Sequence, residues 1–123
     1  MNPGDLLRYT LLGDGTSDRA LMPVLNWLLS DIAGTIPLDP QWANLGPLSR
    51  PEKGLTHRMS LALQYYPCHI LFVHRDAERP DAMDERIDEI GRAGSGLPAR
   101  QSDICRVCVV PVRMFVRTLF VKS

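Results

Sequence analysis

The chain has 123 residues, with 14 lysines and arginines against 14 aspartates and glutamates, and 45% of its residues are hydrophobic. This composition is that of an ordinary globular domain, so it excludes a disordered chain and a collagen-like repeat. Zero formal net charge does not indicate a strongly basic nucleic-acid-binding domain, because affinity for phosphate grows with the number of cationic contacts. A substrate bound through metal ions stays open at this charge.

The sequence predicts one domain over residues 1–123, with 113–123 as a truncated or extended tail. No apolar run reaches the length of a bilayer-spanning helix, and the N-terminus is interrupted by Asp5 and Arg8, unlike a signal peptide. Three cysteines are too few and odd in number for a disulfide framework. We therefore expect a cytoplasmic protein with no membrane partner.

The first half of the chain predicts two strands around one helix. Leu6–Leu12 is a short apolar run that stops at a glycine-rich turn, which is typical of a buried strand. Helical spacing of apolar residues follows from Ser17 to Ile32, with Thr16 or Ser17 available as the N-cap. Pro23 should kink this helix or break it into two pieces. The proline-rich segment 35–51 suits a short, irregular strand.

The second half continues the alternation. Residues 52–66 predict a helix, and 69–74 are the clearest strand, with four consecutive apolar residues typical of a strand covered on both faces. A third helix is expected over 80–90, a flexible loop over 91–98 and a fourth strand over 104–112.

Strands that alternate with helices imply crossover connections. The predicted fold class is therefore α/β, as a three-layer structure with a mostly parallel four-stranded sheet. The apolar, β-prone segment from Met114 to Val121 is expected to add to an edge strand or to pair with a second chain.

Acidic residues follow two of the predicted strands. Parallel α/β sheets place ligands at the carboxyl ends of their strands, which selects residues 13–18 and 74–78. If these two strands are neighbours, the carboxylates of Asp14, Asp76 and Glu78 meet at one edge of the sheet. A hard divalent cation such as Mg²⁺, or Mn²⁺, relieves the repulsion among clustered carboxylates, and it can polarise a phosphodiester or activate water.

These motifs resemble a known family, the Toprim domain shared by topoisomerases, primases and the overcoming-lysogenization-defect nucleases. The segments LLGDGTSDRALMPVLNWLL, ILFVHRDAE and VVPVRM are similar to a group of small bacterial Toprim-like proteins often associated with ABC-type ATPases or phage defence. The resemblance runs from about Leu6 to Met114 and implies a Rossmann-like fold.

The resemblance also implies a function, that of a Mg²⁺-dependent phosphotransfer domain, as a nuclease cleaving DNA or RNA. In that family the first acid serves as general acid or base, a position matched here by Asp14, and an Asp-x-Asp pair binds Mg²⁺, matched by Asp76 and Glu78. Ser17 and Asp18 match the rest of the first motif. The usual first acid is Glu, so Asp14 is one methylene shorter.

Three alternatives remain at this stage. Asp14 and Ser17 also suit a turn and a helix cap, and Asp76 and Glu78 a solvated loop, although their joint occurrence after two apolar strands favours a site. The shorter first acid and the neutral charge favour a catalytically degenerate partner subunit of an ATPase or a self-associating module, such as a homodimer. A flavodoxin-like receiver or small-molecule binder is the third, and it needs a fifth strand.

The remaining polar candidates are either expected to bind substrate or expected to have a structural role. Ser17, His74 and Arg75 are the expected substrate-binding residues, with Arg75 serving either to contact phosphate or, as we favour, to neutralise the flanking acids. His57 and His69 have no ligand spacing and are expected to be structural.

Two pairs of residues complete the candidates. Cys105 and Cys108 are three apart on a strand, which puts their thiols on opposite faces, so a metal or redox pair is not favoured. Trp27 and Trp42 are expected to be core or interface anchors rather than base-stacking platforms, because no basic residues interleave with them.

Overall fold

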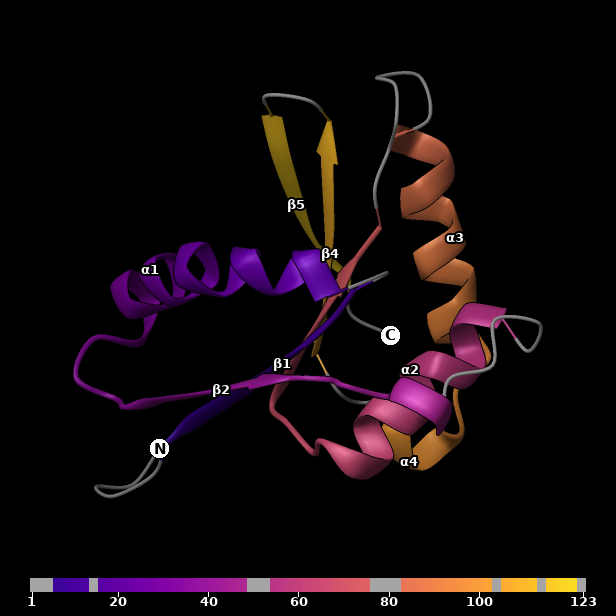
Figure 1. The fold of residues 1–123 in the computed structure, drawn as a ribbon, viewed down its shortest axis with the longest axis horizontal. Helices are drawn as coiled ribbons and strands as arrows, with labels where there is room; N and C mark the ends of the chain where they lie inside the picture. The colour runs from indigo at the N-terminus through magenta and orange to yellow at the C-terminus, as the bar shows by residue number, and fades with distance from the viewer. Residues whose placement is uncertain are drawn as a thin grey trace.

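The structure is a computed structural model, and it describes residues 6–13, 16–48, 54–75, 83–102, 105–112 and 115–121. These residues form an α/β fold, as the sequence predicts. One open sheet runs through it, with helices on both sides (Figure 1).

The sheet has five strands in the order β2-β1-β3-β4-β5. They are β1 (Leu7–Leu12), β2 (Leu38–Trp42), β3 (Ile70–His74), β4 (Cys105–Val112) and β5 (Phe115–Val121). The first four strands run parallel to their neighbours, and β5 pairs with β4 in the antiparallel direction.

The prediction of a four-stranded sheet is therefore wrong by one strand. The apolar tail adds to the edge, because only two residues separate β4 from β5 and so short a connection favours an antiparallel neighbour. In a receiver-like sheet a fifth strand would follow a crossover and run parallel. The antiparallel direction of β5 departs from that pattern.

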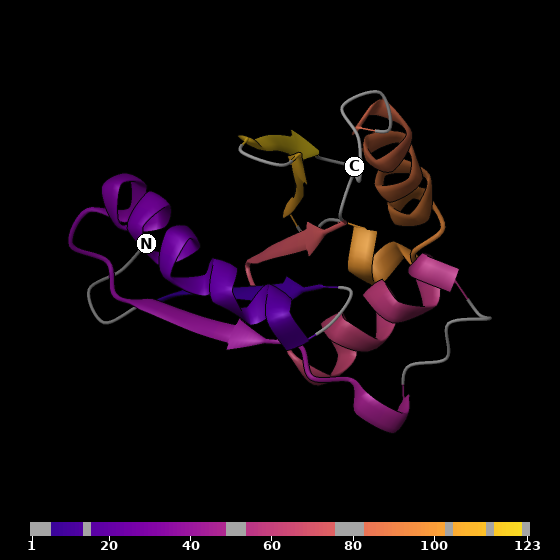
Figure 2. The same ribbon diagram turned by 45° about the horizontal axis from the view of Figure 1, so that its top comes forward.

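The helices divide between the two faces of the sheet. They are the 3₁₀ helix η1 (Thr16–Leu21), α1 (Met22–Ala33), the 3₁₀ turn η2 (Gly46–Leu48), α2 (Gly54–Tyr65), α3 (Met83–Ser95) and α4 (Ala99–Ser102). Helix α1 covers one face, while α2 and α3 cover the other (Figure 2). The result is three layers.

Pro23 divides the helix that the sequence predicts from Ser17 to Ile32. The chain runs as a 3₁₀ helix to Leu21, and α1 then begins with Pro23 in its first turn, where the missing N–H has no intrahelical partner to lose. The break in two pieces is thus confirmed. The expected cap is wrong, because α1 has Leu21 at its N-cap, with no side-chain hydrogen bond there.

Helix α3 extends further than the sequence predicts. Residues 91–95, expected in a flexible loop, are helical. Burial explains the difference, since Ala93 and Leu97 join Ile90 in the core. Gly96 allows α2 to come close, because a Cβ at this position would lie 3.1 Å from the Thr56 side chain.

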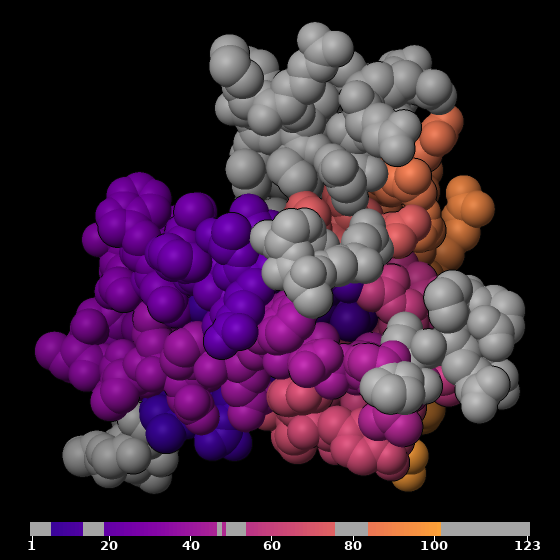
Figure 3. All heavy atoms as spheres, in the orientation of Figure 1, coloured from indigo at the N-terminus to yellow at the C-terminus, as the bar shows by residue number. Residues whose placement is uncertain are grey.

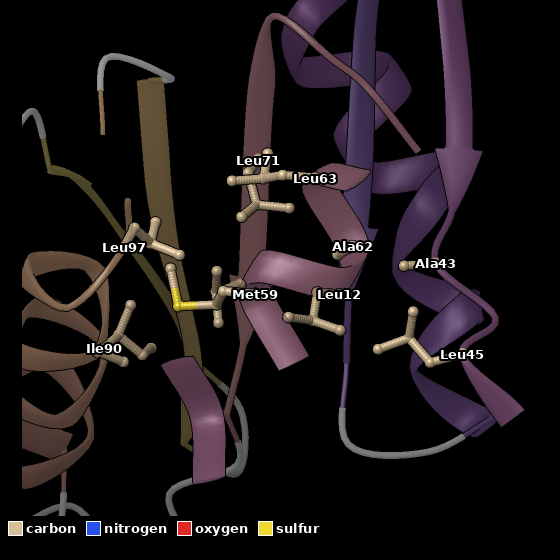
Figure 4. Packing of buried hydrophobic residues seen from close by; sticks show 11 residues of the cluster. Leu12, Ala43, Leu45, Met59, Ala62, Leu63, Leu71, Ile90 and Leu97 are labelled. Carbon is tan, nitrogen blue, oxygen red and sulfur yellow. The ribbon is translucent and has the colours of Figure 1, made fainter. Parts of the chain in front are cut away.

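Side chains of β1 and β3 alternate between two hydrophobic clusters. Leu12, Leu71 and Val73 face α2 and α3, where Met59 is fully buried. Figure 4 shows Met59 of α2 lying between Leu12 of β1 and the α3 side of the cluster. On the opposite face a second cluster contains Tyr9, Leu11, Leu25, Leu29 and Phe72. The two central strands are therefore covered on both sides.

Tyr9 ties α1 to the sheet. Its ring meets Phe72 edge to face, with centroids 5.4 Å apart, and its hydroxyl donates a 2.6 Å hydrogen bond to Asn26 Oδ1. Burial raises the pKa of Tyr9 to about 12. The folded state therefore holds this proton at a pH where an unfolded tyrosine releases it.

This difference predicts a loss of stability in alkali. Between the unfolded pKa of about 10 and the folded value the unfolded state binds fewer protons, so the free energy of unfolding falls as pH rises, by at most about 1.4 kcal/mol per pH unit. We expect Tyr9→Phe to remove this contribution in urea unfolding compared at pH 9 and pH 11. Tyr65→Phe, at a half-exposed position, is the control, and an equal pH response of the two variants would contradict the assignment.

Candidate functional site

The neighbouring ends of β1 and β3 form the switch point of the sheet. From β1 the chain passes to β2 on one side and later returns to β3 on the other, so the order of strands reverses at β1. Leu12 of β1 pairs with Val73 of β3, and both strands end within one residue of this pair. In open parallel sheets the loops diverge at such a point and leave a crevice for ligands.

The three predicted carboxylates follow these two strand ends in the sequence. Asp14 comes directly after Gly13, and Asp76 and Glu78 come one and three residues after Arg75. All three lie outside the described residues. The structure pairs Leu12 of β1 with Val73 of β3, so Gly13 and His74, which follow these two residues in the chain, come at the same edge of the sheet, and Ser17 is the second residue of η1.

His74 and Arg75 differ in exposure. His74 is the last residue of β3 and is only 5% exposed, whereas Arg75 is half-buried. The guanidinium is therefore the more accessible of the two to a ligand at this edge.

Glu89 of α3 holds Arg75. Nη2 of Arg75 lies 3.0 Å from Glu89 Oε1, while Arg86 Nη1 donates a 2.8 Å hydrogen bond to the other carboxylate oxygen. The sequence favours neutralisation of the adjacent acids by Arg75, and the structure adds a partner 14 residues away. The Glu89 carboxylate thus orients the guanidinium groups of Arg75 and Arg86 beside the carboxyl edge of the sheet.

Arg58 is a residue of this edge that the sequence interpretation missed. It belongs to α2, and its Nη2 atom donates a hydrogen bond to the carbonyl oxygen of Gly13. The sequence does contain a signal for Arg58 at this edge, because a helix that follows a parallel strand begins at the carboxyl edge of the sheet. Arg58 is in the second turn of such a helix.

Other polar candidates lie at the opposite end of β3. The backbone N–H of Arg8 donates to His69 Nδ1 at 3.0 Å, and His69 N–H donates to the Arg8 carbonyl at 2.9 Å, so His69 fastens β3 to β1. This agrees with its expected structural role. Burial raises the pKa of the neighbouring Cys68 thiol, which makes it a weaker nucleophile and metal ligand.

The two tryptophans differ in how far their side chains are buried. Trp42 packs against the α1-side cluster, with the Arg19 guanidinium 5.4 Å from its ring centroid. Trp27 is 74% exposed, so it is no core residue, and a role as an interface anchor stays a prediction.

Two negative findings apply to the described ranges alone. Within them no group of three or more His, Cys, Asp or Glu side chains could hold a metal ion. Among those same residues, no helix has both the length and the apolar character needed to cross a membrane.

Removing the Glu89 charge should leave Arg75 and Arg86 as like charges and lower the free energy of unfolding. We expect Glu89→Gln to cost about 0.5–1 kcal/mol at low salt, because the pairs are partly exposed, and less in 1 M salt. Urea denaturation at both salt concentrations measures this. The matched control is Asp88→Asn, an exposed neighbour on α3, and an equal effect of the two substitutions would contradict a special role for Glu89.

Comparison with known proteins gives this chain no family. No protein-family model, curated protein or solved structure matches it.

Proposed function

We propose that this protein is a Toprim-like, Mg²⁺-dependent phosphotransfer domain that acts as a nuclease on DNA or RNA. The observation that supports it is the pairing of β1 with β3 at the switch point of a parallel sheet. This pairing meets the condition under which the two acidic motifs share one edge. A Rossmann-like arrangement of the Toprim type is part of the same proposal.

The donor set suits a hard cation. Asp14, Asp76 and Glu78 offer carboxylate oxygens only, which are the ligands that Mg²⁺ and Mn²⁺ accept. Such an ion, when bound, supplies a positive charge that polarises a phosphodiester and lowers the pKa of a bound water. In this proposal Asp76 and Glu78 hold the metal, and Asp14 serves as a further ligand or as the general base.

The cationic residues at the edge fit a phosphate substrate. Arg75 is oriented by Glu89 at 3.0 Å, and Arg58 reaches the end of β1. Guanidinium groups match the geometry of phosphate oxygens and stay charged at all relevant pH values. In this proposal Arg75, with Ser17 and His74, contacts the substrate phosphate.

Asp76→Asn tests the proposal. The exchange keeps the size of the side chain and removes one anionic metal ligand, so we expect cleavage of plasmid DNA or of RNA in Mg²⁺ or Mn²⁺ to fall at least about 100-fold. Asp88→Asn makes the same exchange at an exposed position of α3 and should cleave at the wild-type rate. Equal cleavage by both variants, or none by the wild type with either metal, would reject the nuclease.

A second candidate function is supported by the outer surface of α1. Val24, Trp27 and Ile32 are 51%, 74% and 65% exposed on this helix, which forms part of the surface at the left of Figure 3. Large apolar side chains gathered on one helix are typical of protein interfaces, and Trp is enriched at their energetic centres. The alternative is therefore a self-associating module, or a partner subunit of an ATPase in a defence system.

Trp27→Glu tests the self-associating form. A charge in the middle of an apolar interface loses its hydration, so we expect a wild-type dimer by light scattering and a monomeric variant with unchanged thermal stability. Gln64→Glu, which introduces the same charge at an exposed position of α2, serves as the control. A wild-type protein that stays monomeric at high concentration would contradict self-association.

A further inference from the structure

One face of the β4–β5 pair has no helix on it among the described elements. Helix α1 lies over the part of the sheet formed by β2, β1 and β3, and β4 and β5 extend beyond it in both ribbon views (Figures 1 and 2). The described helix that packs against β4 is α3, which belongs to the opposite face. The α1 side of β4 and β5 is therefore open in the part of the chain that the structure describes.

The register of the sheet shows which residues share this open face. Phe72 of β3 belongs to the cluster under α1, and it pairs with Val107 of β4, which pairs in turn with Phe120 of β5. Paired residues lie on the same face of a sheet, and every second residue along a strand returns to that face. The positions of the open face are Val107, Val109, Pro111, Val116, Thr118 and Phe120. All but Thr118 are apolar, so the apolar surface that α1 covers on β3 continues across β4 and β5.

Helix α1 itself is apolar on two sides. Leu25 and Leu29 are buried in the cluster against the sheet, while Val24, Trp27 and Ile32 are more than half exposed on the outer surface. A helix on the surface of a domain normally has a polar outer side, whereas a helix that is apolar all round is typically covered on both sides. The chain thus has two unpartnered apolar surfaces, one on a helix and one on a sheet.

The signs of the charges near the two surfaces are opposite. Asp31 is the only ionisable residue of α1, and it is exposed. Residues 105–121 include Arg106, Arg113 and Arg117 and no acidic residue. By register Arg106 and Arg117 are at positions of the opposite face, so the open face itself contains no charged residue while the potential around it is positive.

These charges favour one contact between two copies of the chain. A contact of α1 with the α1 of another copy would bring two Asp31 carboxylates together, and a contact between two β4–β5 pairs would gather arginines. A contact of α1 with the β4–β5 pair of another copy brings opposite charges together instead. Complementary potentials of this kind select the partner surface and exclude the contacts between like charges.

We propose that this chain forms a homodimer in which α1 of each copy covers the open face of the other copy. In the sheet β2 and β1 lie on one side of β3, while β4 and β5 lie on the other. A two-fold axis between two facing sheets therefore places each α1 over the open face of the other copy, and it makes both contacts at once. The two α1 helices are then buried between the sheets. The inference rests on the self-associating form of the proposed function and does not depend on the metal site.

Photo-crosslinking from position 27 tests which surface α1 meets. We expect Trp27→p-benzoylphenylalanine, in a mixture of isotope-labelled and unlabelled protein, to form cross-links between copies to peptides from residues 105–121. The same group in place of Tyr65, which is half-exposed on α2, should form none to that segment. Cross-links from position 27 to α1 or to other elements of the second copy only, or no cross-links between copies, would overturn the proposal.

Sedimentation equilibrium tests the contribution of the open face. Thr118→Lys introduces a charge that loses its hydration in the contact, so we expect the dissociation constant of the dimer to rise at least about 100-fold. Gln64→Lys makes a similar change at an exposed position of α2 and should leave the constant unchanged. An unchanged dissociation constant for Thr118→Lys would exclude the open face as the contact.

Asp31→Lys decides the matter even if Thr118→Lys does not fold, because Asp31 is exposed. This variant reverses the charge of α1 and keeps its apolar residues, so we expect a dissociation constant about five- to tenfold higher at low salt and a smaller change in 1 M salt. Asp88→Lys, at an exposed position of α3, is the control. Equal constants for the two variants would contradict the contact of α1 with the β4–β5 pair.

This inference and self-association fail in different ways. If Trp27→Glu is monomeric and Thr118→Lys still forms the wild-type dimer, self-association through α1 stands and the proposed contact is overturned. If the wild type is a monomer at high concentration, both fail. Weaker dimers in Trp27→Glu, Thr118→Lys and Asp31→Lys, with cross-links from position 27 to residues 105–121, support both.

Discussion

Burial of β1 and β3 on both faces limits where this protein can hold a ligand site. Successive side chains of the two strands enter opposite clusters, one under α1 and one under α2 and α3. A polar group within such a strand would lose its hydration, so ligands and charges are expected beyond the strand ends. The chain leaves this apolar region at Gly13 and at His74, each one residue beyond the paired Leu12 and Val73.

Much of this arrangement could be predicted from local sequence patterns. Four consecutive apolar residues before His74 predict a strand covered on both faces, and Pro23 predicts the division between η1 and α1. The errors share a cause, which is tertiary packing. The glycines of 91–95 favour a loop locally, but buried Ala93 stabilises the longer helix, and β5 is held by its pairing with the edge of β4.

The candidate site, too, could be predicted from the sequence only in part. The acids Asp14, Asp76 and Glu78 are evident in the sequence, but a shared edge requires that the two strands before them be neighbours, a condition that the sequence left open and that the pairing of β1 with β3 meets. Contacts that orient side chains are not evident there. Arg58 is 45 residues from Gly13 and Glu89 is 14 from Arg75, so only the packing of α2 and α3 against the sheet brings these partners together.

Zero net charge and a phosphate substrate are compatible once charge is considered locally. Arg58 and Arg75 lie near one edge, and Glu89 pairs with both Arg75 and Arg86. The proposed metal ligands would add three negative charges there. In the proposed site a divalent cation would offset two of those three negative charges, and the nearby guanidinium groups would weaken the repulsion of a phosphate by the charge that is left. Affinity for nucleic acid would then depend on this local arrangement, and a neutral protein could bind its substrate without an extended basic surface.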